Sequence, residues 1–158
     1  MKRFLLALLA LVLSSTAHAR NPQTEAMIKT CIAQAAETFH IPALPIEILR
    51  DVEAGEVGRV SKNDNGSYDI GPMQINSSWL PTLAAMGISE SALRDNACVN
   101  AYVGTWIYYQ AWRETGNVAQ AMARYHSPYS RFQARYLGLV LQAIDRRTAQ
   151  SAPSVASR

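Results

Sequence analysis

A single glutamate, Glu53, is the residue of this sequence best placed for acid–base chemistry. It follows the apolar turn ILRDV, and a long irregular segment rich in Gly, Asn, Asp and Ser begins directly after it. The negative end of a helix dipole disfavours a carboxylate, and the apolar neighbours Val52 and Ala54 indicate partial loss of water. Both effects raise the pKa of a carboxyl group toward the range that a general acid needs. The alternative is a solvated glutamate at a helix end.

Glycoside hydrolysis commonly uses a pair of carboxylates, and two acids of the irregular segment, Glu56 and Asp69, are candidates for the second one. Glu56 lies beyond Gly55 and is expected to face solvent. Asp69 is the better candidate for a partner of Glu53, because the loop can fold back and bring it across a cleft. The favoured interpretation of Asp69 is nevertheless a turn residue that accepts backbone N–H bonds.

The irregular segment closes on GPMQIN, in which polar and apolar residues alternate. If this segment is extended, the amides of Gln74 and Asn76 lie on one side, and the apolar Met73 and Ile75 lie on the other. Amides bind the N-acetyl and hydroxyl groups of sugars, but they serve equally well as caps between a loop and a helix.

A tyrosine–histidine pair, Tyr125-His126, ends a later helix. The Tyr125 hydroxyl can reach a cleft, whereas most other aromatic residues fall at helical spacing and are expected in the core. His126 is either a ligand or base or, more commonly, a structural histidine. No histidine sits at ligand spacing from a cysteine, so the sequence indicates no metal site. It also contains no glycine-rich phosphate loop and no evident Ser or Cys nucleophile with its His and Asp partners.

The elements that carry these residues are helical almost throughout. Asn21-Pro22 is typical of a helix start, and Gly55 with Gly58 is expected to end the helix that carries Glu53. Asn65-Gly66 is typical of a tight turn, and its flanks, residues 58–61 and 67–70, predict a small β-hairpin. The expected helices begin near residues 22, 45, 81, 90, 97, 118 and 132. The pattern predicts one mainly α domain with a small β excursion beside the candidate site.

The first 19 residues are predicted to be a signal peptide. Lys2 and Arg3 precede an apolar run over residues 4–13, and Ala17-His18-Ala19 has the small residues of a cleavage site. The run is too short to cross a bilayer, which needs roughly 20 apolar residues. An uncleaved membrane anchor is the alternative.

The charge of the remaining chain is low. Cleavage removes Lys2 and Arg3, so the basic residues fall from 15 to 13 while all 12 acids remain, and the net charge falls from +3 to +1. Without a basic cluster, this balance argues against nucleic-acid binding. The domain is expected over residues 20–147, and the Ser-, Ala- and Pro-rich residues 148–158 are expected to form a disordered tail.

Cys31 and Cys98 are the two cysteines of the chain. An even number in an exported protein favours a disulfide, which would tie an early helix to a late one. Two buried free thiols are the alternative.

Three motifs, ILRDVEAG, NGSYDIGPMQIN and RYHSPYSRFQARY, together resemble the lytic transglycosylases of the goose-type lysozyme superfamily. The resemblance is strongest to the small exported enzymes that accompany conjugation, type IV secretion, pilus and invasion machineries. It covers about residues 25–145, and it implies a lysozyme-like helical fold, no cofactor, peptidoglycan glycan strands as the substrate and the periplasm of a Gram-negative bacterium.

The resemblance also implies roles for particular residues. The catalytic glutamate of the family falls on Glu53, and the residues of its cleft fall on Met73, Gln74 and Tyr125. A serine in the spacer after the acid corresponds to Ser61. Asp69 and Asn76 remain auxiliary candidates.

This chain departs from the family pattern at three positions. The usual Glu-Ser pair reads Glu53-Ala54, which leaves the acid intact. The usual Tyr-Asn reads Tyr125-His126, which removes any contact made by that asparagine. Pro72 stands where the family more often has leucine, which is expected to change the stiffness of the loop and not its chemistry.

By this resemblance the protein cleaves the bond between N-acetylmuramic acid and N-acetylglucosamine and leaves 1,6-anhydro ends. Two alternatives stay open. A hydrolytic muramidase would use Asp69 or Glu56 to position water, and a non-catalytic module would only bind the wall.

Overall fold

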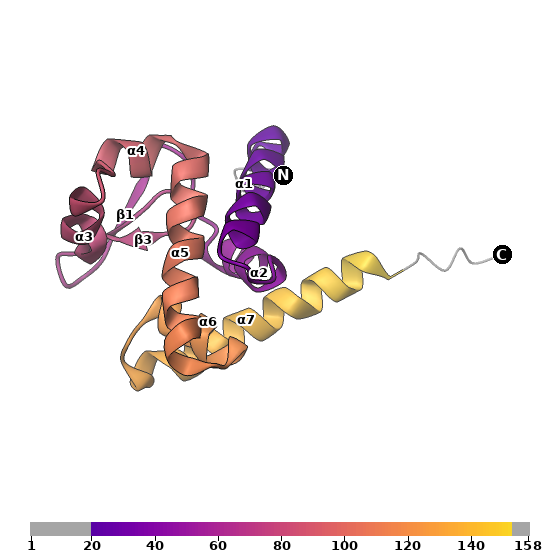
Figure 1. The fold of residues 1–158 in the computed structure, drawn as a ribbon. Helices are drawn as coiled ribbons and strands as arrows, with labels where there is room; N and C mark the ends of the chain where they lie inside the picture. Colours follow the sequence, from indigo (N-terminus) through magenta and orange to yellow (C-terminus); the bar gives the residue numbers. More distant parts are fainter. Residues whose placement is uncertain (1–19, 153–158) are drawn as a thin grey trace, which may run out of the picture.

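The chain folds around one long helix, α5 (Ala97–Thr115), which runs through the middle of the molecule (Figure 1). The computed structural model describes residues 20–152. Helices α1 (Pro22–Thr38) and α6 (Val118–His126) pack against α5. The apolar face of α5 is buried, with Val103, Ile107 and Tyr108 at its centre. The predicted signal peptide, residues 1–19, lies outside the described part of the chain.

Asparagine side chains begin the helices that frame the site. The Asn21 Oδ1 atom accepts hydrogen bonds from the backbone N–H groups of Gln23 and Thr24, which confirms the predicted start of α1. Asn96 caps α5 in the same way, by accepting from Cys98 and Val99. These side chains satisfy N–H groups that the first turn of a helix leaves without partners.

A small antiparallel sheet stands on one side of α5, in the strand order β1-β2-β3. Its strands are β1 (Val60–Lys62), β2 (Tyr68–Ile70) and β3 (Ile75–Asn76). The predicted hairpin is therefore confirmed, with β1 beginning two residues later than expected. A 3₁₀ helix, η1 (Ser77–Trp79), and the short helices α3 (Leu80–Ala85) and α4 (Glu90–Asp95) complete this side of the molecule. The predicted mainly α fold with a small β-hairpin is confirmed.

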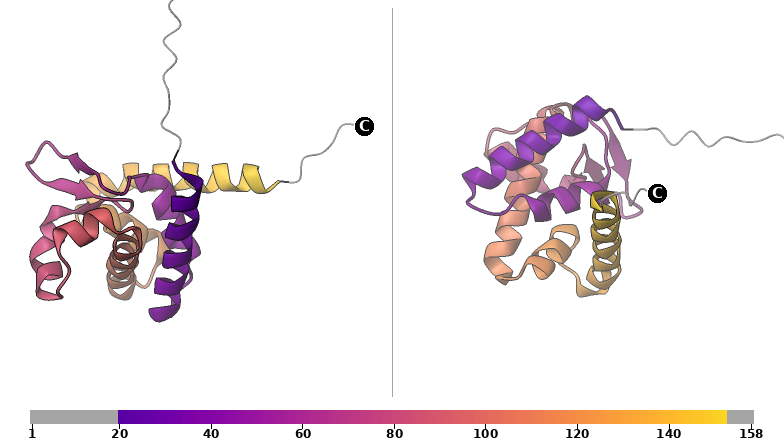
Figure 2. Two further views of the ribbon diagram at one scale, coloured as in Figure 1. Left: turned by 90° about the horizontal axis from the view of Figure 1, so that it is seen from above. Right: turned by 90° about the vertical axis from the view of Figure 1, so that its right-hand side faces the viewer.

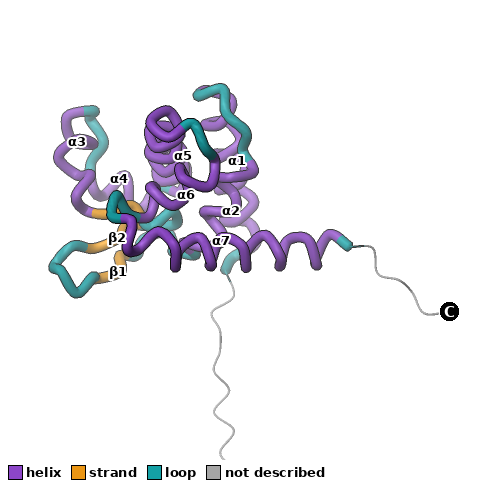
Figure 3. The backbone as a smooth tube through the Cα atoms, turned by 90° about the horizontal axis from the view of Figure 1, so that it is seen from below, coloured by secondary structure: helices purple, strands orange, loops and turns teal. Residues whose placement is uncertain are grey.

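Helix α7 (Ser130–Ser151) crosses the base of the molecule and extends beyond it (Figure 2). It lies beside α6 and α2 (Figure 3) and packs against both. Helix α2 (Leu44–Glu53) ends at the candidate acid. The helix continues to Ser151, past the start that the composition suggested for a disordered tail. Ion pairs of Arg147 with Glu47 and Asp51 hold this end of α7 against α2. Residues 153–158 lie outside the described part of the chain.

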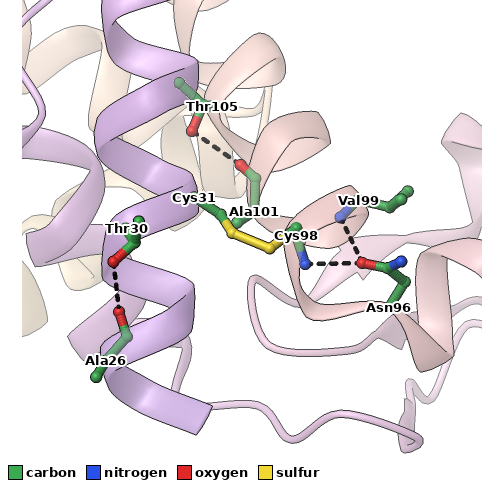
Figure 4. Close-up of a disulfide and its surroundings, with 8 residues drawn as sticks. All are labelled: Ala26, Thr30, Cys31, Asn96, Cys98, Val99, Ala101 and Thr105. Atoms are coloured by element: carbon green, nitrogen blue, oxygen red, sulfur yellow. Dashed lines mark hydrogen bonds between the residues drawn. A yellow bond between two sulfur atoms is a disulfide. The ribbon is translucent and has the colours of Figure 1, made fainter. Parts of the chain in front are cut away.

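A disulfide joins Cys31 of α1 to Cys98 at the start of α5 (Figure 4), as predicted. The two residues are 67 positions apart in the sequence. None of the helices in residues 20–152 has the length and apolar character needed to cross a membrane.

Replacing both cysteines by alanine is expected to lower the free energy of unfolding by about 4 kcal/mol, because the unfolded chain then regains the entropy of a long open loop. Urea unfolding under oxidising conditions measures this loss. A reducing agent should destabilise the wild type and leave the double variant unchanged. Equal unfolding midpoints for the two proteins would contradict the prediction.

Candidate active site

Glu53 is the last residue of α2, and it lies on the buried face of that helix. Ile46, Leu49, Arg50 and Glu53 follow one another at helical spacing, and the first three are almost fully buried. The helix ends at Ala54, which adopts the left-handed conformation with φ 52°. The expectation that Gly55 ends this helix is therefore wrong. A glycine is required at position 55 because of a close contact with another segment, and not because of the helix end.

Gly55 lies directly against the turn formed by residues 71–74. A Cβ atom on Gly55 would come within 2.1 Å of the Gly71 carbonyl oxygen and 2.5 Å of Gln74 Nε2. Gln74 also has a left-handed backbone, with φ 49°, and its side chain donates to the Gly71 carbonyl. Non-glycine residues in this conformation cost about 1 kcal/mol or more, so surrounding contacts must hold them. The end of α2 and the 71–74 turn are thus locked together.

Three side chains fix this turn from different helices. The buried Asn100 of α5 accepts from the Met73 N–H group and donates to the carbonyls of Ile70 and Leu93. Arg50 of α2 donates to the Pro72 carbonyl. Tyr125 of α6 donates to the Met73 carbonyl at 2.8 Å. The turn is therefore a rigid part of the core.

The arrangement of GPMQIN differs from the predicted extended segment. Only Ile75 and Asn76 are extended, because residues 71–74 form the turn. Met73 and Ile75 nevertheless point inward, and Gln74 and Asn76 remain partly exposed. The Met73 side chain is 0% exposed and packs against Gly104, so it has no surface with which to contact a ligand. Its contribution is the backbone carbonyl that orients Tyr125.

The carboxyl group of Glu53 is held by a tyrosine from the far end of the chain. Tyr136 of α7 donates a hydrogen bond to Glu53 Oε1 at 2.6 Å. Burial raises the pKa of the Tyr136 hydroxyl far above its usual range, so this group stays protonated and acts as the donor. On its other side, the Tyr136 ring stacks on His126 with the ring centroids 4.3 Å apart.

Burial raises the pKa of Glu53 from its ordinary 4.5 to about 7. The hydrogen bond from Tyr136 acts in the opposite direction, because it stabilises the carboxylate. The nearby Asp69 carboxylate raises this pKa further, and the Arg50 guanidinium lowers it. The side chain remains half-buried and not sealed off. A carboxyl group with this pKa can both donate and accept a proton near neutral pH.

Asp69 belongs to a polar cluster on the sheet. Its Oδ1 atom accepts from Asn76 Nδ2 at 2.8 Å, and its Oδ2 atom accepts from Asn63 Nδ2 at 3.0 Å. Ser61 stands opposite Asp69 on β1, and Asn76 stands opposite it on β3. Directly opposed residues share a face of a sheet. The structure thus brings Ser61, Asp69 and Asn76 into one row, and the charge of Asp69 reaches Glu53 and Tyr125.

Glu56 is turned away from this row. It forms an ion pair with Arg59 at 2.8 Å. Together with Gly55 and Val57 it lines a surface hollow that also includes Arg20, Glu25 and Arg50. Neither this hollow nor a second one between α1 and α7 includes Glu53 in its lining. The buried carboxyl group therefore defines the candidate site, and the two hollows do not. Residues 20–152 contain no cluster of three or more His, Cys, Asp or Glu side chains that could hold a metal ion.

Sequence reasoning missed Asn100, Arg50 and Tyr136 as parts of the site. Arg50 and Asn100 carry a usable signal, because each is a polar residue at a core position of an otherwise apolar helix face. Tyr136 offers no such signal. Its helical spacing predicts a core residue, which it is, but it does not reveal the partner of its hydroxyl group.

The fold and the site together define a class: a mainly α domain in which a half-buried helix-end glutamate faces a small polar sheet. No family model matches the chain. Among curated proteins, the chain is 34% identical over 98 residues to the invasion protein IagB of Salmonella typhimurium strain SL1344, and the match covers 61% of each chain.

Two further relatives resemble the chain at comparable levels. A peptidoglycan-binding-like protein of Escherichia coli O157:H7 is 32% identical over 108 residues, which covers 63% of this chain and 65% of the relative. The protein IpgF of Shigella flexneri is 29% identical over 98 residues, which covers 61% and 64% of the two chains. The chain therefore spans somewhat less than two thirds of the length of these relatives.

The close approach at Gly55 predicts a sharp difference between two glycines. Gly55→Ala should destabilise the fold by roughly 1–3 kcal/mol, since the Gly71 carbonyl is backbone and must move. Gly138→Ala, in the middle of α7 with nothing within 4 Å, should stabilise it by about 0.5–1 kcal/mol. Urea unfolding of both variants measures these changes. Similar effects of the two substitutions would refute the locked junction.

Proposed function

We propose that this protein is a peptidoglycan lytic transglycosylase, which cleaves the glycan strand between N-acetylmuramic acid and N-acetylglucosamine. The observation that carries the proposal is the Glu53 carboxyl group, whose pKa of about 7 results from burial beside Asp69. Two further lines support it. The three sequence motifs resemble those of this enzyme class, and one relative is named peptidoglycan-binding-like.

In the first step, protonated Glu53 gives its proton to the glycosidic oxygen as the bond from that oxygen to the muramyl C1 breaks. An acid with a pKa near the working pH is efficient because much of it is protonated and it still transfers its proton readily. The bond from Tyr136 fixes the orientation of the carboxyl group. The N-acetyl group of the substrate can assist at C1.

In the second step, the Glu53 carboxylate removes the proton from the muramyl C6 hydroxyl, and O6 bonds to C1. The product is a 1,6-anhydro ring, Glu53 is again protonated, and no water is consumed. One carboxyl group therefore serves as acid and as base. Asp69 acts through its charge, since both of its oxygens already accept hydrogen bonds from asparagine amides.

The principal rival is a hydrolytic muramidase, in which a second carboxylate positions water. The ion pair of Glu56 with Arg59 and the two amide bonds to Asp69 favour the transglycosylase. Mass spectrometry of digested peptidoglycan distinguishes the two reactions, because transglycosylation leaves anhydro ends and hydrolysis leaves reducing ends. A non-catalytic wall-binding module would produce neither anhydro ends nor reducing ends.

We further propose that the protein acts in the periplasm, opening the wall locally for a secretion, conjugation or pilus apparatus. The disulfide suits an oxidising compartment. Similarity to a protein named for invasion supports the association with such an apparatus.

Glu53→Gln should lower the cleavage rate by roughly 100-fold to 10,000-fold, the range typical of a lost general acid or base. Glu56→Gln is the matched control and should retain activity, because Glu56 faces Arg59. Release of soluble anhydro-muropeptides from purified peptidoglycan measures both. Activity of Glu53→Gln near the wild-type level would rule out the assignment.

The same substitution should stabilise the protein at neutral and higher pH. Because Glu53 binds its proton more tightly in the folded state than in the unfolded state, stability is lost as the pH rises from about 4.5 through about 7. Glu53→Gln removes this loss, so it should raise the free energy of unfolding by roughly 1–3 kcal/mol at pH 8. Little difference is expected at pH 4. Destabilisation at pH 8 would contradict the proposed burial of the carboxyl group.

Two neutral replacements should move the pH dependence of cleavage in opposite directions. Asp69→Asn removes a charge that raises the pKa of Glu53, so activity should begin to fall at a lower pH than in the wild type. Tyr136→Phe removes a hydrogen bond that lowers this pKa, so the fall should move to higher pH. Profiles of kcat/KM against pH measure both shifts. Profiles that do not shift would show that Asp69 and Tyr136 do not influence the pKa of the catalytic acid.

A further inference from the structure

Two aromatic rings at the start of α7 are unusually exposed. Tyr129 is 61% exposed and Phe132 is 45% exposed. The Arg131 guanidinium lies over both rings, 5.4 Å from the centre of Tyr129 and 4.7 Å from the centre of Phe132. Such cation–π contacts restrain the rings. The aromatic surface is therefore held in place while it remains open to solvent.

The stretch of sequence that carries these rings contains basic residues and no acids. The sequence has no Asp or Glu between Glu114 and Asp145. Arg131 and Arg135 are four residues apart on α7, so they lie on one face of the helix. Within residues 20–152, neither has an acidic partner within 4.0 Å. Two guanidinium groups are thus available to an anionic ligand.

This surface lies close to the candidate active site along α7. Phe132 and Tyr136 are also four residues apart, so they share a face of α7 about 6 Å apart along its axis. Tyr136 is the residue that binds Glu53. Gln133 donates to the Ser127 carbonyl at 3.0 Å and ties the start of α7 to the end of α6. The aromatic surface begins one helical turn from the residue that orients the candidate acid.

We propose that Tyr129, Arg131, Phe132 and Arg135, here called the α7 platform, bind a further length of the peptidoglycan polymer outside the Glu53 site. This proposal rests on the proposed function. Aromatic faces stack on the apolar faces of sugar rings, and guanidinium groups pair with carboxylates. A peptidoglycan strand offers both, because its glycan carries peptides that end in carboxylates. The position one helical turn from Tyr136, the partner of Glu53, favours this polymer over an anionic membrane surface, which also attracts basic and aromatic helices.

Binding is measured by co-sedimentation with purified insoluble peptidoglycan, with all proteins carrying Glu53→Gln so that the polymer stays intact. Two double variants remove the platform: Tyr129→Ala with Phe132→Ala, and Arg131→Gln with Arg135→Gln. Each should bind about fivefold to tenfold more weakly than the parent, as expected for the loss of two modest contacts.

Matched controls come from the same helix. Leu141 is an apolar side chain that is 62% exposed, and Arg146 is an exposed cation without an acidic partner among the described residues. Leu141→Ala and Arg146→Gln should bind like the parent. Circular dichroism and urea unfolding check that every variant is folded. Arg135 does not lie over the rings of Tyr129 and Phe132, so Arg135→Gln alone removes one charge without disturbing the cation–π contacts. This single variant should still weaken binding.

Chemical amidation of the peptidoglycan carboxylates tests the ligand chemistry. It should weaken the parent and leave the arginine double variant little changed. Binding to vesicles of phosphatidylglycerol tests the membrane alternative. The parent and both double variants should bind these vesicles equally.

The outcomes separate the two proposals. If the parent does not sediment with peptidoglycan, the proposed function itself fails. If the parent sediments and the platform variants sediment equally well, the platform is refuted while the proposed function stands. Loss of vesicle binding with unchanged sedimentation would assign the surface to a membrane and overturn the platform as a polymer site.

Discussion

The position of the candidate acid depends on one close contact between two backbone segments. Gly55 lies so near the Gly71 carbonyl that no side chain fits between them. This contact fixes the end of α2, and therefore Glu53, against a turn that Asn100, Arg50 and Tyr125 hold from three helices. Preorganisation of this kind lets a catalytic group act without rearrangement. The left-handed residues Ala54 and Gln74 are the local cost of the contact.

Two neighbouring carboxyl groups differ because their environments differ. Among residues 20–152, Glu53 accepts one hydrogen bond, from Tyr136, and its partial burial favours the protonated form. Asp69 has an amide donor on each oxygen and lies on the partly exposed sheet. Its charge raises the pKa of Glu53. In the proposed mechanism, Glu53 is the proton donor and Asp69 is its electrostatic partner, so a second reactive acid is not required.

The sequence alone predicted the features that follow from local pattern. The helical content, the Asn21 cap, the hairpin around Asn65-Gly66 and the disulfide are confirmed. Local sequence pattern could not predict the turn at 71–74, because its shape depends on hydrogen bonds to Asn100, which is distant in sequence. The Glu53–Tyr136 bond spans 83 positions, and no periodicity encodes such a contact. Met73 was expected in a cleft wall, but its side chain is in the core, because the tight turn directs it toward Gly104.

The most direct test of this account is a titration of the Glu53 carboxyl group itself. Carbon-13 NMR of protein labelled at glutamate side-chain carboxyls resolves each group, and the Glu53→Gln variant assigns the resonance. The account predicts a pKa of about 7 for Glu53. A pKa near the ordinary 4.5 would contradict the account, since the carboxyl group would then be ionised at neutral pH and could not act as the acid.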